Sequence, residues 1–141
     1  MRDLDPDANA YVDPDEMADG SLRELTNRII GCAIEVHRHL HGGHLEVAYE
    51  RAMAIELQRR GIPFRQQHPV NVVYKGEVVS ESRLDFLIDD RVILEIKAVE
   101  SLSTVHTAQV LGYLAASGLH LALIINFNVR RLVDGIKRVV K

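Results

Sequence analysis

The stretch RLDFLIDDRVILEIKA, residues 83–98, decides the fold of this chain. It contains two apolar runs, residues 84–88 and 92–98, separated by the turn-forming pair Asp89 and Asp90. Short apolar runs that flank such a turn are typical of a β-hairpin. We therefore predict two adjacent antiparallel strands in this part of the chain.

Three charged side chains interrupt the apolar pattern of this hairpin. Glu95 and Lys97 lie two residues apart and project from one face of their strand, because side chains alternate along a strand. Asp85 is expected alongside Glu95, since each lies about five residues from the turn. One face of the sheet would therefore carry two carboxylates and an ammonium group together.

Charged groups inside apolar strands are costly to bury unless they are paired or bound to a metal ion. Two carboxylates, with a backbone carbonyl such as that of Ile96, are suited to Mg²⁺ or Mn²⁺. Such an ion activates a bound water and offsets charge on a phosphoryl group, and Lys97 would orient that water or stabilise the transition state. A structural ion pair of Lys97 with Asp85 or Glu95 explains the same pattern, and both interpretations stay open at this point.

The sequence on either side of the hairpin predicts helices and further strands. Apolar residues three and four apart predict helices over residues 21–40, 44–60 and 104–117. Ser21 or Asp19 would cap the first helix. Further short strands are predicted at residues 62–65, 70–74, 78–80, 120–125 and 136–140. This order of elements predicts a mixed α/β sandwich, and the asparagines that follow the apolar run 120–125, Asn126 and Asn128, are interpreted as turn formers.

Composition limits the possible classes of protein. The chain has 141 residues, of which 47% are hydrophobic, and a single cysteine. This predicts one globular domain without a disulfide framework or a multi-cysteine metal site. There is no run of about 20 apolar residues for a membrane span, and the N-terminus is acidic where a secretory signal would be basic and then apolar. We therefore expect a cytoplasmic protein that does not act in a membrane.

Charge is distributed unevenly along the chain. The formal net charge is -3, but residues 1–20 carry seven acidic side chains against a single arginine, a local charge of -6. The remaining residues therefore carry +3. We predict that residues 1–20 form a disordered acidic tail and residues 21–141 a single domain. The basic residues within 130–141 would meet phosphate groups, or only cover apolar surface with their stems.

Two motifs resemble known nuclease-like families. Asp85, followed after about ten residues by Glu95-Ile96-Lys97, resembles the signature of the PD-(D/E)XK nucleases, with Leu84 in place of the proline. The heptapeptide GHLEVAY, residues 43–49, matches the motif of the GxxExxY protein family. Further segments resemble that family, and together they cover roughly residues 22–141. These segments are residues 33–37, 73–76, 94–99, 109–113 and 125–127.

The resemblance implies a restriction-endonuclease-like fold, with a mixed sheet flanked by helices, and a nuclease that depends on Mg²⁺ or Mn²⁺ and acts on nucleic acid, most readily DNA. It implies that Glu46, Asp85 and Glu95 are the metal ligands and that Lys97 is the catalytic lysine. Gln109 would be a further catalytic residue, since it begins a segment that resembles the QxxxY element of RecB-like nucleases.

Further residues are candidates for contacts with the substrate. They are His37, Tyr49, Arg83, His106 and Tyr113. Three of them have a structural alternative: packing for Tyr49, a cross-strand ion pair for Arg83 and a helix-surface position for His106. The histidine-rich segment 37–44 lacks the spacing of a zinc site.

Other functions stay open beside the nuclease. One is a module that kept the nuclease fold but only binds nucleic acid or a protein partner, and another is a hydrolase of smaller phosphate esters. A homodimer is possible, because nucleases that cut both strands are often dimers.

Overall fold

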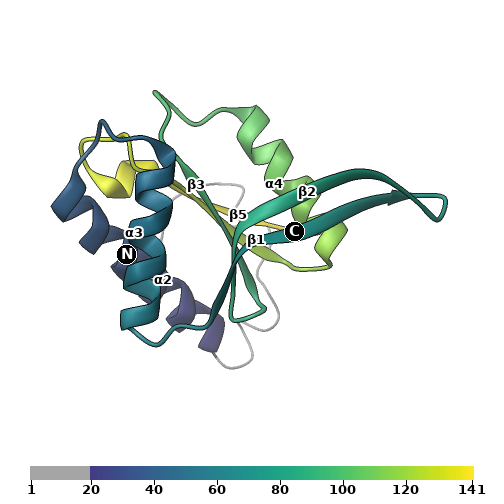
Figure 1. The fold of residues 1–141 in the computed structure, drawn as a ribbon, viewed down its shortest axis with the longest axis horizontal. Helices are drawn as coiled ribbons and strands as arrows, with labels where there is room; N and C mark the ends of the chain where they lie inside the picture. Colours follow the sequence, from purple (N-terminus) through teal and green to yellow (C-terminus); the bar gives the residue numbers. More distant parts are fainter. Residues whose placement is uncertain (1–19) are drawn as a thin grey trace.

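The computed structural model of the protein describes residues 20–141, and residues 1–19 of the predicted acidic tail lie outside the described residues. The described part contains three α-helices, one 3₁₀ helix and five strands (Figure 1). In chain order they are α2 (Ser21–Leu40), α3 (Glu46–Arg59), β1 (Phe64–Tyr74), β2 (Glu77–Ile88), β3 (Val92–Lys97), α4 (Thr104–Ser117), β4 (Leu121–Asn126), η1 (Leu132–Gly135) and β5 (Ile136–Val140). No helix in this part of the chain is both long and apolar enough to span a bilayer.

The strands form one mixed sheet in the order β1-β2-β3-β4-β5. Neighbouring strands are antiparallel except β3 and β4, which run parallel and are joined through α4. Helices α2 and α3 cover one face of the sheet, and α4 packs against the other. Strand β4 is buried along its whole length, because helices lie on both sides of it. The predicted mixed α/β architecture is confirmed.

Two strands are longer than the sequence predicted. The sequence predicts separate strands at residues 62–65 and 70–74, but β1 contains residues 64–65 of the first and all of the second. The same holds for residues 78–80 and 84–88, which lie in β2. Pro69 lies between the two predicted strands, yet β1 continues through it, because β1 is the edge strand of the sheet, where a missing backbone N–H is tolerated.

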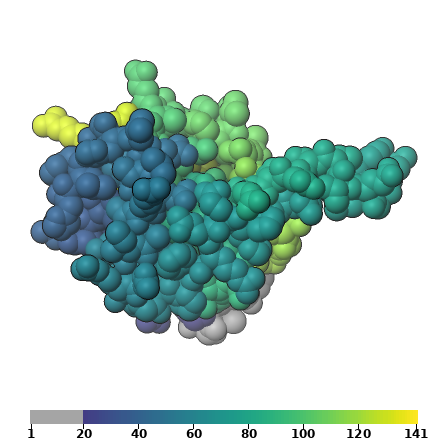
Figure 2. All heavy atoms as spheres, in the orientation of Figure 1, coloured from purple at the N-terminus to yellow at the C-terminus, as the bar shows by residue number. Residues whose placement is uncertain are grey.

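The outer halves of β1 and β2 form a two-stranded arm that projects from the body of the domain (Figure 1 and Figure 2). Lys75 and Gly76 form its tip with left-handed backbone conformations, φ 50° and 84°, as their turn signal predicted. The arm exposes several large apolar side chains. These are Val72, Val73, Tyr74, Val78 and Val79.

The first helix begins differently from the prediction. Gly20 occupies the N-cap position of α2 without a side-chain cap, so the predicted cap by Ser21 is wrong. The Ser21 hydroxyl instead accepts a hydrogen bond of 2.8 Å from Nη2 of Arg91, which ties α2 to the turn between β2 and β3. The alternative cap, Asp19, lies outside the described residues.

Tyr49 holds the connection between α2 and α3 in place. Its ring is fully buried and stacks on Phe127 with centroids 4.7 Å apart. Its hydroxyl donates a 2.6 Å hydrogen bond to the carbonyl of His41 and accepts one of 3.2 Å from the backbone N–H of His44. Between them Gly43 has φ +95°, which a side chain would disfavour. The glycine and the tyrosine of the heptapeptide therefore shape this connection.

We expect Tyr49→Phe to lower the free energy of unfolding by about 1 kcal/mol, because two backbone groups lose their hydrogen-bond partner while the ring stacking remains. Urea unfolding measures the change. Tyr74→Phe is the matched control, since Tyr74 is 61% exposed on the arm. Equal effects of the two substitutions would contradict this role of the Tyr49 hydroxyl.

Candidate active site at the fork between β2 and β3

Strands β2 and β3 pair over only three residues each. The ladder joins residues 86–88 to residues 92–94 and ends there. Beyond it β2 continues beside β1 into the arm, while β3 stays paired with β4 as far as Lys97. The two strands therefore diverge in a fork, and Asp85 and Glu95 are the first residues past the last pair.

At the fork each of these carboxylates binds the backbone of the opposite strand. Oε1 of Glu95 accepts a 3.0 Å hydrogen bond from the backbone N–H of Asp85. Oδ2 of Asp85 accepts one of 2.8 Å from the backbone N–H of Ile96. Side-chain oxygens thus take over the role of backbone carbonyls at the point where the ladder stops. The predicted juxtaposition of Asp85 and Glu95 is present.

Glu95 is 4% exposed, and the pKa of its carboxyl is raised to about 8. Burial is the largest cause, and the negative charge of Asp85 adds to it. The hydrogen bond from the Asp85 backbone and the positive charge of Lys97 act in the opposite direction. Burial and the charge of Asp85 therefore favour the protonated form of Glu95 when no cation is present.

Lys97 is half-buried beside this pair. Within residues 20–141 it forms no ion pair with Asp85 or Glu95, so the predicted alternative of a structural cross-strand ion pair is wrong. Its charge nevertheless lowers the pKa of Glu95 and that of Glu46. Lys97 thus contributes a positive potential to the site while its ammonium group stays available.

Glu46 is the first residue of α3 and lies exposed at the edge of the fork. Its pKa is raised mainly by desolvation; the charge of Lys97 lowers it and that of Asp85 raises it. The start of α3 is therefore close enough for Glu46 to interact electrostatically with the two strands. In the described part of the chain, however, no three His, Cys, Asp or Glu side chains are grouped as a metal site.

The donors at the fork fit a hard divalent cation. Asp85 and Glu95 supply carboxylate oxygens, the ligand type that Mg²⁺ and Mn²⁺ prefer. Glu95 is buried and Asp85 half-buried, and the nearby charge of Asp85 adds to the effect of burial in raising the pKa of Glu95. A cation would offset the negative charge of both carboxylates when they are ionised, and Glu46 is a further carboxylate that interacts electrostatically with Asp85.

Helix α4 brings Tyr113 to the site from the other face of the sheet. Burial raises the pKa of the Tyr113 hydroxyl, the charges of Glu95 and Asp85 raise it further, and a hydrogen bond with Ser82 lowers it. Gln109 lies one turn earlier on α4 and is exposed. His106 has a local role, since its Nδ1 accepts a 3.1 Å hydrogen bond from the backbone N–H of Ser103 at the start of α4.

The remaining residues that were predicted to contact the substrate form hydrogen bonds or packing contacts within the fold. Nε2 of His37 lies 2.9 Å from the carbonyl oxygen of Val129, with the residue 8% exposed. Tyr49 is fully buried and stacked on Phe127, which favours its alternative role in packing. Arg83 is exposed, and its Nη1 donates a 3.1 Å hydrogen bond to the carbonyl of Gln67; in the described part of the chain it forms no ion pair.

Asn126 supports the site in a way that the sequence reading missed. Its Oδ1 accepts a 3.1 Å hydrogen bond from the backbone N–H of Asn128, which forms the predicted turn, and Asn126 is also the last residue of β4 and 1% exposed. Its Oδ1 accepts a 3.0 Å hydrogen bond from the backbone N–H of Val99, and its Nδ2 donates one of 2.9 Å to the Val99 carbonyl. Asn126 therefore fixes the segment that follows Lys97. A polar residue at the end of an apolar run was the available signal.

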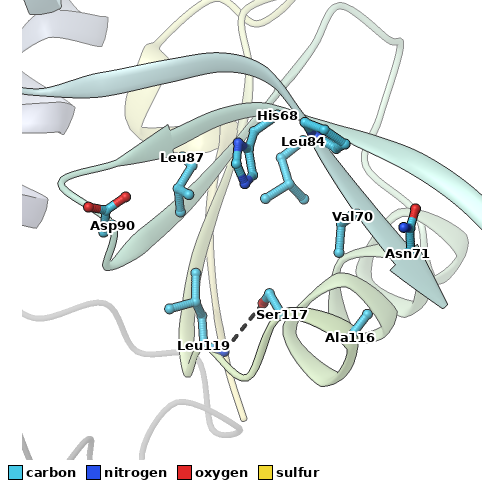
Figure 3. Close-up of a pocket in the computed structure, with 10 residues that line it drawn as sticks. His68, Val70, Asn71, Leu84, Leu87, Asp90, Ala116, Ser117 and Leu119 are labelled. Carbon is cyan, nitrogen blue, oxygen red and sulfur yellow. Dashed lines mark hydrogen bonds between the residues drawn. The ribbon is translucent and has the colours of Figure 1, made fainter. Parts of the chain in front are cut away.

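The domain also has an open hollow of about 430 Å³ between the β1–β2 pair and the C-terminal end of α4 (Figure 3). Its polar lining includes His68 and Asn71, while Val70, Leu84 and Leu87 belong to the apolar cluster under α4. None of the predicted metal ligands lines it. The hollow is therefore separate from the fork.

Comparison with protein families identifies the fold that carries this site. A family model described as the PD-(D/E)XK nuclease superfamily matches residues 23–139. The chain belongs to this superfamily. Neither the comparison with curated proteins nor that with solved structures finds a match.

Membership of the PD-(D/E)XK superfamily supports a nuclease-type function and a nucleic-acid partner. Nucleases of this superfamily generally use divalent metal ions. Leu84 occupies the position of the proline in the superfamily's name. It is buried in the apolar cluster under α4 and is not one of the proposed metal ligands. The narrower assignment to the GxxExxY family stays a prediction.

The raised pKa of Glu95 predicts a pH-dependent cost to the metal-free fold. As the pH rises from the ordinary carboxyl pKa of 4.5 towards about 8, the unfolded chain loses this proton while the folded chain keeps it. Folding then loses on the order of 1 kcal/mol per pH unit across this window. Glu95→Gln keeps the oxygen acceptor without the charge, so it should stabilise the protein increasingly as the pH rises.

Urea unfolding in the presence of a chelator at about pH 5 and about pH 8.5 measures this gain. Glu100→Gln is the control, because Glu100 is exposed and follows the same strand. A stabilisation by Glu95→Gln that is the same at both pH values would contradict a cost caused by ionisation.

Proposed function

We propose that this chain is a metal-dependent nuclease that hydrolyses phosphodiester bonds of nucleic acid, with DNA as the first substrate to test. The observation that carries the proposal is the reciprocal bonding of Asp85 and Glu95 at the fork, 3.0 Å and 2.8 Å to the opposite backbone, beside Lys97, which forms no ion pair within residues 20–141. Superfamily membership supports the same chemistry.

Asp85 and Glu95 would hold Mg²⁺ or Mn²⁺, with Glu46 at the start of α3 as the third ligand. When bound, such an ion lowers the pKa of a coordinated water and offsets the charge of the phosphoryl group. Glu95 must release its proton before it becomes a ligand, so metal binding should weaken as the pH falls below about 8.

Lys97 would act on the reacting phosphate. Its half-buried ammonium group is not held by Asp85 or Glu95, so it is able to orient the attacking water or stabilise charge in the transition state. Tyr113 and Gln109 on α4 would bind the substrate strand next to this position. Arg83 and His106 lie exposed or half-buried on the neighbouring elements as further phosphate contacts. A cytoplasmic location and a homodimer remain predictions.

We expect Asp85→Asn and Lys97→Met each to reduce metal-dependent cleavage roughly 10²-fold or more, because the first removes a charged metal ligand and the second removes the positive charge at the reacting phosphate, while the side-chain shape is kept. Cleavage of plasmid and of short oligonucleotides with Mn²⁺ is the measurement, and the thermal midpoint of unfolding checks the fold. Glu81→Gln and Lys75→Met on the exposed arm are matched controls. Activity that survives both site substitutions would sink the proposal, and turnover of oligonucleotides without plasmid would point to smaller phosphate esters.

A second candidate function is a binding module that retains the nuclease fold without catalysis. The observation that favours it is the projecting arm, whose exposed Val73, Tyr74 and Val79 give an apolar surface more typical of protein partners than of nucleic acid. The arm also carries Lys75 and Glu77 together, without an excess of positive charge.

Calorimetry with Mn²⁺ separates the two candidates. The nuclease proposal predicts micromolar Mn²⁺ binding to the wild-type chain and its loss in Glu95→Ala. The module predicts no Mn²⁺ binding by either protein. Wild-type binding that persists in Glu95→Ala would show that the metal occupies a different position and would contradict the proposed site.

A further inference from the structure

Gln67 interrupts β1 directly opposite the site. Its φ of +51° lies in the left-handed region, which is unfavourable for a residue with a side chain. On both sides of it β1 pairs with β2 in register, but in the described sheet Gln67 has no ladder partner at the position facing Asp85. Other interactions must therefore hold its backbone in this conformation.

The side chain of Gln67 supplies these interactions. Its Nε2 donates a 2.8 Å hydrogen bond to Oε1 of Glu50 on α3 and one of 3.3 Å to Oδ1 of Asp85 on β2. A primary amide nitrogen has two hydrogens, so one group is able to serve both carboxylates. Arg83 also donates a 3.1 Å hydrogen bond to the Gln67 carbonyl. Gln67 thus joins α3 to β2 through its amide.

Both oxygens of Asp85 are then bonded. Oδ1 accepts from Gln67, and Oδ2 accepts from the backbone N–H of Ile96. A carboxylate held at both oxygens has a fixed orientation, yet each oxygen keeps a lone pair that is able to bind a cation. Outer-shell hydrogen bonds of this kind set the orientation and affinity of metal ligands.

We propose that Gln67 is a positioning residue for the Asp85 carboxylate. Through its amide it fixes the position of this carboxylate relative to Glu50 on α3. This proposal rests on the proposed function, because it gives Asp85 the role of a metal ligand. Glu46 lies one helical turn before Glu50. The same link therefore sets the position of α3, and with it Glu46, relative to Asp85.

Gln66 provides a matched control. Its Nε2 donates a 2.7 Å hydrogen bond to Oε2 of Glu50, so it ties β1 to α3 as Gln67 does. Among the hydrogen bonds of the described residues, Gln66 has none to Asp85. The substitutions Gln66→Met and Gln67→Met thus remove equivalent ties to the helix, and only the second removes the bond to Asp85.

The first experiment needs no metal. Nuclear magnetic resonance spectra of the full chain are recorded with chelator. The side-chain amide signals of Gln67 and Gln66 are assigned as those that disappear in Gln67→Met and in Gln66→Met. Asp85→Asn replaces the charged acceptor with a weaker neutral one, so the Gln67 amide proton signals should move upfield while those of Gln66 stay in place. Unchanged Gln67 signals would overturn the proposal.

The second experiment is calorimetric titration of the full chain with Mn²⁺. We expect Gln67→Met to weaken Mn²⁺ binding about tenfold or more, with Gln66→Met close to wild type and with similar thermal midpoints for both variants. Equal Mn²⁺ affinity in the two variants would overturn the positioning role, because a purely structural tie to α3 is lost in both. If the wild-type chain bound no Mn²⁺, the proposed function would fail, and the amide signals would still decide whether Gln67 holds Asp85.

Discussion

The hydrogen bonds between the Asp85 and Glu95 carboxylates and the facing backbone are the interaction on which the rest of the site depends. They lie where the β2–β3 ladder ends, and they satisfy backbone N–H groups that the diverging strands would otherwise leave without partners. Because β2 leaves β3 at this point, it is free to continue with β1 into the arm. Because β3 continues beside β4, Lys97 is carried past the fork on a buried strand.

The same arrangement opposes stability. Glu95 is buried next to a second carboxylate, and its raised pKa reports that the folded protein disfavours the charge of this group. A fold selected for stability alone would place an apolar residue there, as it does at the neighbouring Leu94 and Ile96. The unfavourable charge is therefore understood best as a feature of the proposed function, because a divalent cation would convert the repulsion between Asp85 and Glu95 into ligand bonds.

The parts of the site that sequence predicts well depend on local geometry. Asp85 faces Glu95 because a tight turn, with Asp89 and Asp90 at φ 52° and 54°, fixes the register of a short hairpin. The parts that sequence misses depend on contacts between distant segments. Gln67 would pass for a surface residue of an edge strand, and nothing local reveals that it lies beside Glu50 and Asp85.

A break in a sequence pattern has different meanings in different positions of a sheet. Pro69 interrupts the predicted strands, but on an edge strand a proline costs no ladder bond, so β1 continues through it. Asn126 also follows an apolar run, yet it lies in the interior. Its side-chain amide forms hydrogen bonds with both the backbone N–H and the carbonyl of Val99. Neither outcome follows from residue type, since strand order and burial decide both.

The exposure of the site residues indicates how a phosphate would reach them. Glu95 is buried, Asp85 and Lys97 are half-buried, and Glu46 and Gln109 are exposed. Glu46 lies on α3 and Gln109 on α4, and these helices cover opposite faces of the sheet. A polyanion that approaches the fork would meet the half-buried ammonium of Lys97 before the buried carboxylate of Glu95. The net charge of -3 is therefore a poor guide to its partner, because the local order of charges along this path governs the approach.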